Sequence, residues 1–418
     1  MDVIVVGSGL LGLTSAYYLA EQGFQVQVID RQSGPALETS FANGGLLTPS
    51  LSDPWNAPGV FWHMLKSINR EESPLLLRPA VLPSLATWGL RFLHHSSPAR
   101  YQQNILRNTR MAAYNLRVLN QLRQDIGLSS FGGGHGTIKL CRDQAAIDHS
   151  AEMAEFLSPE SIRFEVLDRQ ATFAREPALQ PLGEQVAGAV YFPDDQFGNA
   201  HQFCSELAAA LGKRGIEFHF NTAVTALRVH KAAISGVELG DDYLAADRVV
   251  LAAGSYSPLL AKTAGVNLPI RPCKGYSLTL PTEGLDALPH LPVIDDALHA
   301  AVVPLGSTLR VAGTAEFSGY DTKLNPQRLN NLFNLLEAVY PQVAPRLDRD
   351  KASPWTGLRP VSASGVPLIG ATAISNLYVN AGHGHLGWSM AAGSGKLLAD
   401  LVAGQKPEIN ATDYAATA

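Results

Sequence analysis

The order of apolar and polar positions changes type twice within the first thirty residues. A continuous apolar run, Val3–Val6, meets glycines at 7 and 9, apolar residues then recur at helical spacing over 10–22, and an alternating stretch follows over 24–30. A continuous apolar run is typical of a strand buried in a parallel sheet, and alternation is typical of a half-buried strand. The pattern therefore predicts a strand–helix–strand unit that ends at Asp30.

The pattern over the rest of the chain separates two kinds of region. Five prolines between 54 and 83 precede a long helical stretch over about 100–126. An amphipathic helix over 201–215 is followed by four strand-like segments, and the last of these, 247–254, is again an apolar run. More strands, a helix over 326–341, and finally a strand and a closing helix complete the chain.

This order predicts an α/β protein with two interleaved domains. We expect a Rossmann-like dinucleotide-binding domain and an inserted α+β substrate domain with a mixed sheet. The expected pieces are 1–50, 195–268 and 352–418 for the first domain, and 51–194 and 269–351 for the second. A length of 418 residues with 46% hydrophobic and 17% charged residues fits two globular domains.

Charge and cysteine content exclude several classes of protein. The net charge of -5 and the lack of a basic run argue against a nucleic-acid partner. The cysteines at 141, 204 and 273 are widely spaced and form no metal-ligand pattern, so we expect neither a disulfide framework nor a metal site. No apolar stretch is long enough to span a bilayer, and the N-terminus lacks the features of a signal peptide. These observations favour the cytoplasm.

Gly7, Gly9 and Gly12 form a GxGxxG fingerprint between the first strand and the first helix. Such glycines permit a tight turn, let a pyrophosphate approach the backbone, and let the helix pack on the strand. The helix N-terminus favours the phosphates, and Asp30 is placed to accept the ribose hydroxyls. The glycine cluster at 132–136 precedes a strand-like segment, so one dinucleotide site is expected. The fingerprint by itself leaves NAD and FAD open.

Four later segments give the chain a family resemblance. The segment 38–45, ETSFANGG, looks like the stretch that runs along the flavin in the D-amino acid oxidase superfamily, and 247–257, 355–360 and 380–388 are similar to its later motifs. The resemblance extends over essentially the whole chain and comes closest to the bacterial FAD-dependent D-amino acid dehydrogenases. It implies a fold of the glutathione-reductase type with FAD as cofactor. The residues expected to bind FAD are Gly7, Gly9, Leu10, Leu11, Gly12, Asp30, Arg31, Ser40, Asn43, Gly44, Gly45, Leu46, Val224, Ala253, Gly254, Gly382, His383, Gly384, His385, Leu386 and Gly387.

Arg359 carries the expectation about the substrate. A guanidinium fork matches a carboxylate, and the resembling oxidases use an arginine in this GxRP setting to hold an amino acid. The alternative is a structural salt bridge at a domain boundary. Tyr276 and His385 are further candidates for catalytic residues, and Lys274 is a candidate for the pocket. A strand tyrosine, however, is more often core, and a histidine in a glycine turn is more often structural.

The resemblance implies oxidative deamination of a D-amino acid, including D-proline or a hydroxylated D-proline, by hydride transfer to flavin N5. Electrons would pass to a quinone or another acceptor that is not NAD. The alternatives are a glycine- or sarcosine-type amine oxidase and a subunit that only carries FAD. In covalently flavinylated sarcosine oxidases a cysteine makes the flavin bond, and Gly357 lies at that position here, so we expect non-covalent FAD. Residues 75–95 either lie on the inner face of the cytoplasmic membrane or are buried, and burial is the favoured interpretation.

Overall fold

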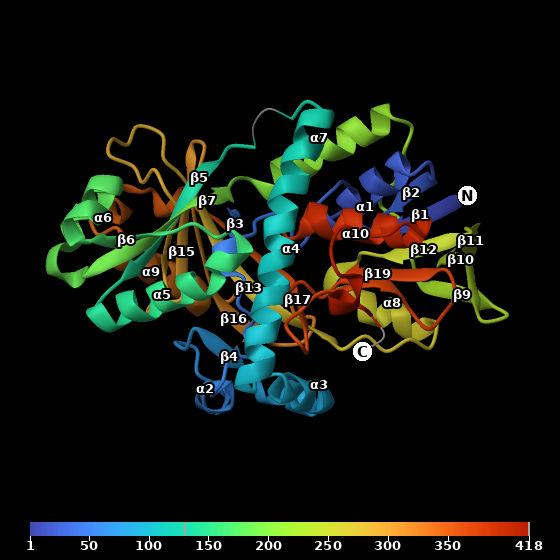
Figure 1. Ribbon diagram of the computed structural model, residues 1–418, viewed down its shortest axis with the longest axis horizontal. Helices are drawn as coiled ribbons and strands as arrows, with labels where there is room; N and C mark the ends of the chain where they lie inside the picture. The colour runs from blue at the N-terminus through green and yellow to red at the C-terminus, as the bar shows by residue number, and fades with distance from the viewer. Residues whose placement is uncertain (129–130, 417–418) are drawn as a thin grey trace.

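The computed structural model describes residues 1–128 and 131–416, which are built around two large sheets (Figure 1). The first sheet has six strands, and all neighbouring strands run parallel except β18 and β19, which form an antiparallel pair at one edge. Its strands in spatial order are β18 (Leu368–Ala371), β19 (Leu377–Ala381), β12 (Arg248–Leu251), β1 (Asp2–Val6), β2 (Gln25–Ile29) and β8 (Glu217–His219).

Both faces of this sheet are covered, as its apolar strands require. On one face Val3, Val5 and Val28 share a core with helices α1 (Leu10–Glu21), α7 (Ala200–Lys213) and α10 (Ala391–Ala403). On the other face Ile4 and Ile29 pack against a small three-stranded sheet and helix α8. These elements are β9 (Ala226–His230), β10 (Ala233–Leu239), β11 (Asp242–Ala245) and α8 (Ser257–Thr263).

The second sheet has ten strands and forms the left half of the molecule in Figure 1. Eight follow the order β17 (Ser353–Ser362), β13 (Ile270–Pro281), β16 (Thr308–Phe317), β15 (Ala300–Leu305), β14 (Val293–Asp295), β5 (Gly134–Cys141), β7 (Gly188–Phe197) and β3 (Leu46–Leu47). Two short strands pair at the side, β4 (Leu75–Leu77) with β16 and β6 (Glu165–Asp168) with β7.

Helices cover the large sheet and connect it to the first one. Helix α9 (Pro326–Val339) packs with α6 (Arg169–Arg175) on the core of the large sheet, and α5 (Gln144–Leu157) contacts β7. The long helix α4 (Pro98–Asp125) passes between the two halves and packs on α10 (Figure 1). Helices α2 (Val60–Lys66) and α3 (Leu82–His94) lie at the lower edge in that view.

The mixed α/β fold is the one expected from the sequence, but two strands lie outside their expected domain. β3 falls within the piece 1–50, yet it pairs with β7 in the large sheet. β17 falls within the piece 352–418 that the sequence groups with the dinucleotide domain, yet it pairs along its whole length with β13 in the large sheet. The segment 75–95 is largely buried on one side: Leu76, Leu77, Trp88 and Phe92 are in the core, whereas Leu90 is 71% exposed. Among the helices of the described residues, none is long and apolar enough to span a membrane.

Candidate active site

The glycine fingerprint forms a turn that leaves no room for side chains. Gly7 has a φ of 106°, in the left-handed region, and a Cβ on Gly12 would lie 1.8 Å from the Gly7 carbonyl oxygen. Helix α1 therefore packs directly on β1, and its first turn faces the space beyond the strand ends. Gly7, Gly9 and Leu10 line a large cavity there.

Asp30 lies at the end of β2 beside this turn. Its carboxylate accepts hydrogen bonds from the backbone N–H and the hydroxyl of Ser8, both at 2.6 Å, and from the backbone N–H of Gln32 at 2.8 Å. Arg31 pairs with Glu38, and its guanidinium lies 3.8 Å from the centre of the Tyr256 ring. Both Asp30 and Arg31 line the cavity, so this end provides an acidic acceptor and a stacking surface.

The cavity has a volume of about 1060 Å³ and extends from the fingerprint to the face of the large sheet. Of the residues expected to bind FAD, all line the cavity except Gly12 and Gly382. Gly12 instead serves the packing of α1 on β1, and Gly382 packs against Ile270 and Ser362, with 3.3 Å between an added Cβ and each side chain. Val224 lines the cavity from the loop before β9 rather than from a strand.

Three buried polar atoms along the cavity have no hydrogen-bond partner in the described part of the chain. They are Oγ1 of Thr314, Nδ1 of His383 and Nε1 of Trp388. Unpaired buried polar atoms are costly, and a polar ring system or a substrate bound in the cavity would satisfy them. The residues present thus fit a dinucleotide with a large polar ring at this end.

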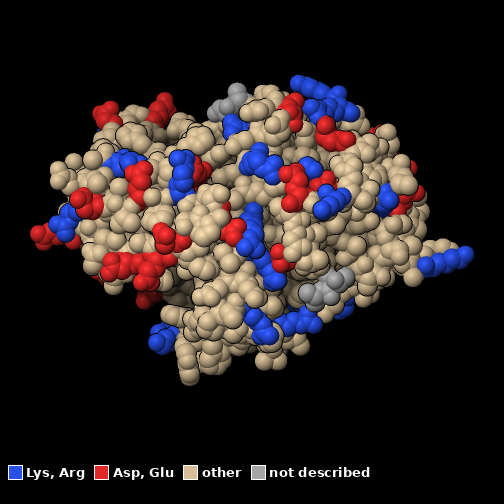
Figure 2. All heavy atoms as spheres, viewed as in Figure 1, with Lys and Arg blue, Asp and Glu red and all other residues tan. Residues whose placement is uncertain are grey.

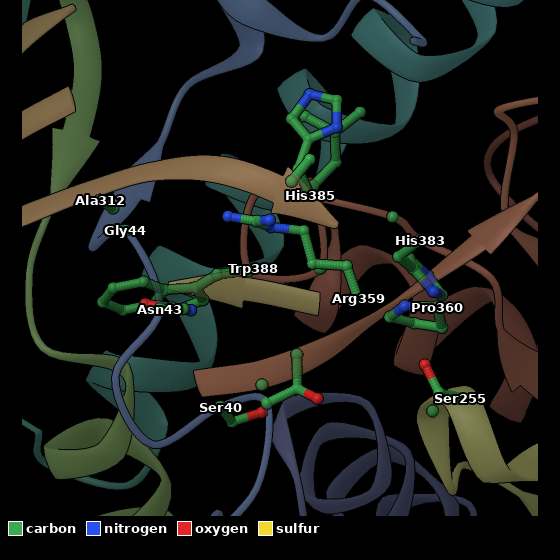
Figure 3. Close-up of a pocket in the computed structure, with 18 of the residues that line it drawn as sticks. Ser40, Asn43, Gly44, Ser255, Ala312, Arg359, Pro360, His383, His385 and Trp388 are labelled. Atoms are coloured by element: carbon green, nitrogen blue, oxygen red, sulfur yellow. The ribbon is translucent and has the colours of Figure 1, made fainter. Parts of the chain in front are cut away.

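Arg359 is the principal charged group at the sheet end of the cavity. It projects from β17 between His385 and the segment with Asn43 and Gly44 (Figure 3). Its Nη1 donates to the carbonyl oxygen of Thr314 at 3.1 Å. Among the described residues no carboxylate pairs with it, and burial lowers its pKa from the ordinary value. The alternative of a structural salt bridge is therefore wrong, and the guanidinium is available for a ligand carboxylate.

A distortion in β16 positions the carbonyl that holds Arg359. Thr314 is the extra residue where the register between β13 and β16 shifts, and it has a φ of 57°. A positive φ is unfavourable for a β-branched residue, so the surrounding structure must impose this conformation. Such bulges redirect groups next to functional sites.

His385 and Trp55 form the next layer of the cavity wall. Their rings are stacked, with 5.1 Å between centroids and 8° between planes, and Cζ of Arg359 lies 5.6 Å from the Trp55 ring centroid. The His385 ring faces the cavity. Its pKa is lowered first by loss of water around the ring and then by the positive charge of Arg359. A neutral imidazole follows at pH 7.

His383 has a different environment. It is only 4% exposed, and its Nε2 shares a hydrogen bond of 2.9 Å with the hydroxyl of Ser394. Burial lowers its pKa to about 3, so this ring is neutral as well. The turn 382–387 does not lead directly into α10, because that helix begins at Ala391.

Tyr276 lines the cavity as expected, but its hydroxyl is engaged within the protein. Its hydroxyl donates to Glu316 at 2.6 Å within a buried ion network, and Lys274 is in the same network through Asp321 at 2.9 Å. Neither Glu316 nor Lys274 lines the cavity. Side chains alternate between the two faces of a strand, so Lys274 lies on the opposite face from Arg359. We assign neither Tyr276 nor Lys274 a catalytic role.

Sequence reasoning missed Trp55, Thr314 and Gly275. Trp55 lies in a loop, where no periodicity distinguishes it, and the bulge at Thr314 has no sequence signature. Gly275 gave a usable signal, because a glycine inside a strand often marks a close approach of another group.

Comparison with known proteins agrees with this geometry. Residues 2–401 match the DAO family of FAD dependent oxidoreductases, and the chain belongs to this family. FAD is therefore the cofactor of this chain.

Particular relatives are similar along their whole length. A D-amino acid dehydrogenase from Bradyrhizobium diazoefficiens is 41% identical over 410 residues, which is 98% of this chain and 97% of the relative. One from Paramagnetospirillum magneticum is 41% identical over 411 residues, with 98% and 97% covered. The structure of glycine oxidase from Geobacillus kaustophilus superposes with a TM-score of 0.76 at 22% identity, covering 100% of this chain and 98% of that one. The last likeness concerns the fold.

Proposed function

We propose that this protein is an FAD-dependent dehydrogenase that oxidises D-amino acids to imines, which water converts to 2-oxo acids and ammonia. The observation that carries the proposal is Arg359, whose guanidinium lies on the wall of the cavity that accommodates FAD and has no acidic partner among the described residues. The relatives named D-amino acid dehydrogenase support the choice of substrate class.

The work of the chain in this reaction is to bind and orient the amino acid. Arg359 holds the carboxylate in a two-pronged contact, which fixes the direction of the α C–H bond. When bound, FAD supplies the acceptor for the hydride from Cα. Burial lowers the pKa of His383 and His385, so both imidazoles are weak bases, and the hydroxyl of Tyr276 donates to Glu316. The substrate amine therefore loses its proton to solvent before or during binding, without a side-chain base.

Anaerobic mixing of the purified yellow protein with D-alanine tests the proposal. Loss of the flavin absorbance in the visible range, with release of pyruvate and ammonia on reoxidation by a dye, is the expected result. Loss of absorbance with glycine or sarcosine but with no D-amino acid would replace the proposal by an amine oxidase. A flavin that no amine reduces would indicate an electron-carrying subunit.

We further propose that the electrons leave to a quinone at a membrane surface. Four large apolar side chains are exposed on neighbouring helices, at 43% for Phe61, 66% for Trp62, 46% for Leu65 and 71% for Leu90. The edge formed by α2 and α3, at the bottom of Figure 2, is mostly uncharged with a few basic atoms. Exposed aromatic and apolar side chains beside basic ones are typical of binding to anionic lipid surfaces.

A further inference from the structure

A second charged group without a partner lies in the same cavity as Arg359. Asp53, in the loop before α2, lines the cavity, and no ion pair or side-chain hydrogen bond engages its carboxylate in the described parts of the chain. The carboxylate accepts a hydrogen bond from the backbone N–H of Asp53 itself. Loss of solvent raises the pKa of Asp53, and the more distant Lys139 offsets this only in part.

The groups around Asp53 do not neutralise it. Lys139 is already paired, because its Nζ lies 2.6 Å from Oδ2 of Asp296. Tyr101 lines this part of the cavity, where burial and then the charge of Asp53 raise the pKa of its hydroxyl. If Asp53, Lys139 and Asp296 are all charged, this part of the cavity carries one net negative charge.

The two unpaired charges belong to one binding space. Asp53 is two residues from Trp55, whose ring lies 5.6 Å from Cζ of Arg359, and all three residues line the cavity. A free guanidinium and a free carboxylate in one enclosed space favour a ligand with a carboxylate at one end and a cation at the other, since each unpaired buried charge is costly. An amino acid with a basic side chain has this chemistry.

We propose that Asp53 is a specificity-determining residue that binds the cationic end of the substrate side chain, so that basic D-amino acids such as D-lysine, D-ornithine and D-arginine are preferred substrates. The inference rests on the proposed function, in which Arg359 holds the α-carboxylate. The charge-assisted contact forms only with an ionised Asp53, and the incoming cation itself favours that form.

The test compares substrates of equal length with and without the distal cation. For the holoenzyme, kcat/KM with D-lysine should exceed that with D-norleucine, and Asp53→Asn should lower the ratio of the two at least tenfold while leaving D-norleucine nearly unchanged. Asp53→Glu should restore much of the ratio. Asp241→Asn, in the turn between β10 and β11, is the matched control and should leave the ratio unchanged. An unaltered ratio in Asp53→Asn would overturn the inference.

A binding measurement separates this inference from the proposed function. 6-Aminohexanoate has the carboxylate and the distal amine of lysine but no α-amine, so it cannot be oxidised at Cα. Titration followed by the flavin absorbance change should give a Kd for 6-aminohexanoate at least tenfold weaker in Asp53→Asn, with no change for hexanoate. If this holds and no D-amino acid reduces the flavin, the proposed function fails and the Asp53 site stands. If D-alanine reduces the flavin and 6-aminohexanoate binds both proteins equally, the Asp53 site fails alone.

Discussion

Arg359 and Gly275 pack so closely that no side chain fits between them: an ideal Cβ on Gly275 would lie 2.3 Å from Cζ of Arg359. The two residues are on neighbouring strands, where β17 pairs with β13. The guanidinium is thus directed over bare backbone toward the carbonyl of Thr314. The orientation of the guanidinium depends on the absence of a single methyl group at Gly275.

Gly275→Ala should displace Arg359 while leaving the fold intact, because the colliding atoms are the far end of a flexible side chain. We expect kcat/KM with D-alanine to fall at least tenfold, with FAD content and melting temperature near those of the parent. Steady-state kinetics measures kcat/KM, and flavin absorbance measures the FAD content. Gly212→Ala, in α7, has open space around its Cβ and is the control. Unchanged kinetics would show that the position of Arg359 is not critical.

Arg359→Lys should weaken amino acid oxidation strongly, because lysine keeps the charge and loses the two-pronged geometry. The loss in kcat/KM should correspond to about 2 kcal/mol or more, roughly 30-fold. Amines without a carboxylate, assayed side by side, should lose much less. An equal loss for both kinds of substrate would point to damage to the site rather than to a lost carboxylate contact.

FAD should be released by acid, because no cysteine lines the cavity in the described residues and Gly357 occupies the position of the linking cysteine in the resembling oxidases. All three cysteines are buried, and burial raises the pKa of Cys273 to about 12, so its thiol is not a nucleophile at neutral pH. After trichloroacetic acid precipitation the yellow colour should stay in the supernatant. A yellow peptide after proteolysis of the pellet would contradict this.

Asp195 should make the protein less stable as the pH rises. Burial raises its pKa from the ordinary value of 3.8 to about 7, although the hydroxyls of Ser50 and Thr137 donate to it. The folded state then binds more protons than the unfolded state between these values, so the free energy of unfolding falls from about pH 4 to pH 7. Each pKa unit corresponds to about 1.4 kcal/mol. Asp195→Asn should therefore raise the melting temperature relative to the parent at pH 8 and much less at pH 5. An equal change at both pH values would exclude this role.

Trp62→Ser should weaken membrane binding without affecting the chemistry. Trp62 is 66% exposed, so its removal costs the fold little and removes apolar area available to lipid. Co-sedimentation with vesicles containing anionic lipid should show reduced binding, whereas anaerobic reduction by D-alanine stays the same. Tyr243→Ser, at 48% exposure on the small sheet, is the control. If neither protein binds vesicles, the membrane contact is wrong.

The sequence by itself determined the local structure of the cofactor site. The fingerprint, its helix and Asp30 are consecutive in the chain, so their hydrogen bonds and close glycine contacts follow from short-range geometry. The long helix expected over 100–126 was found over 98–125, and the apolar run at 247–254 contains the parallel strand β12. Arg359 could be singled out because a guanidinium matches a carboxylate and because its GxRP setting resembles that of the amino acid oxidases.

Only the tertiary structure decided which side chains face the cavity. Tyr276 and Gly275 are adjacent in sequence, yet one belongs to a buried ion network and the other supports Arg359, because neighbouring residues of a strand point to opposite faces and a bulge at Thr314 alters the pairing. Asp53 and Arg359 are more than three hundred residues apart, so their shared cavity depends on how two sheets pack. Sequence periodicity indicates which residues of one helix or strand are buried. Whether a charge has a partner depends instead on which side chains the other elements place near it.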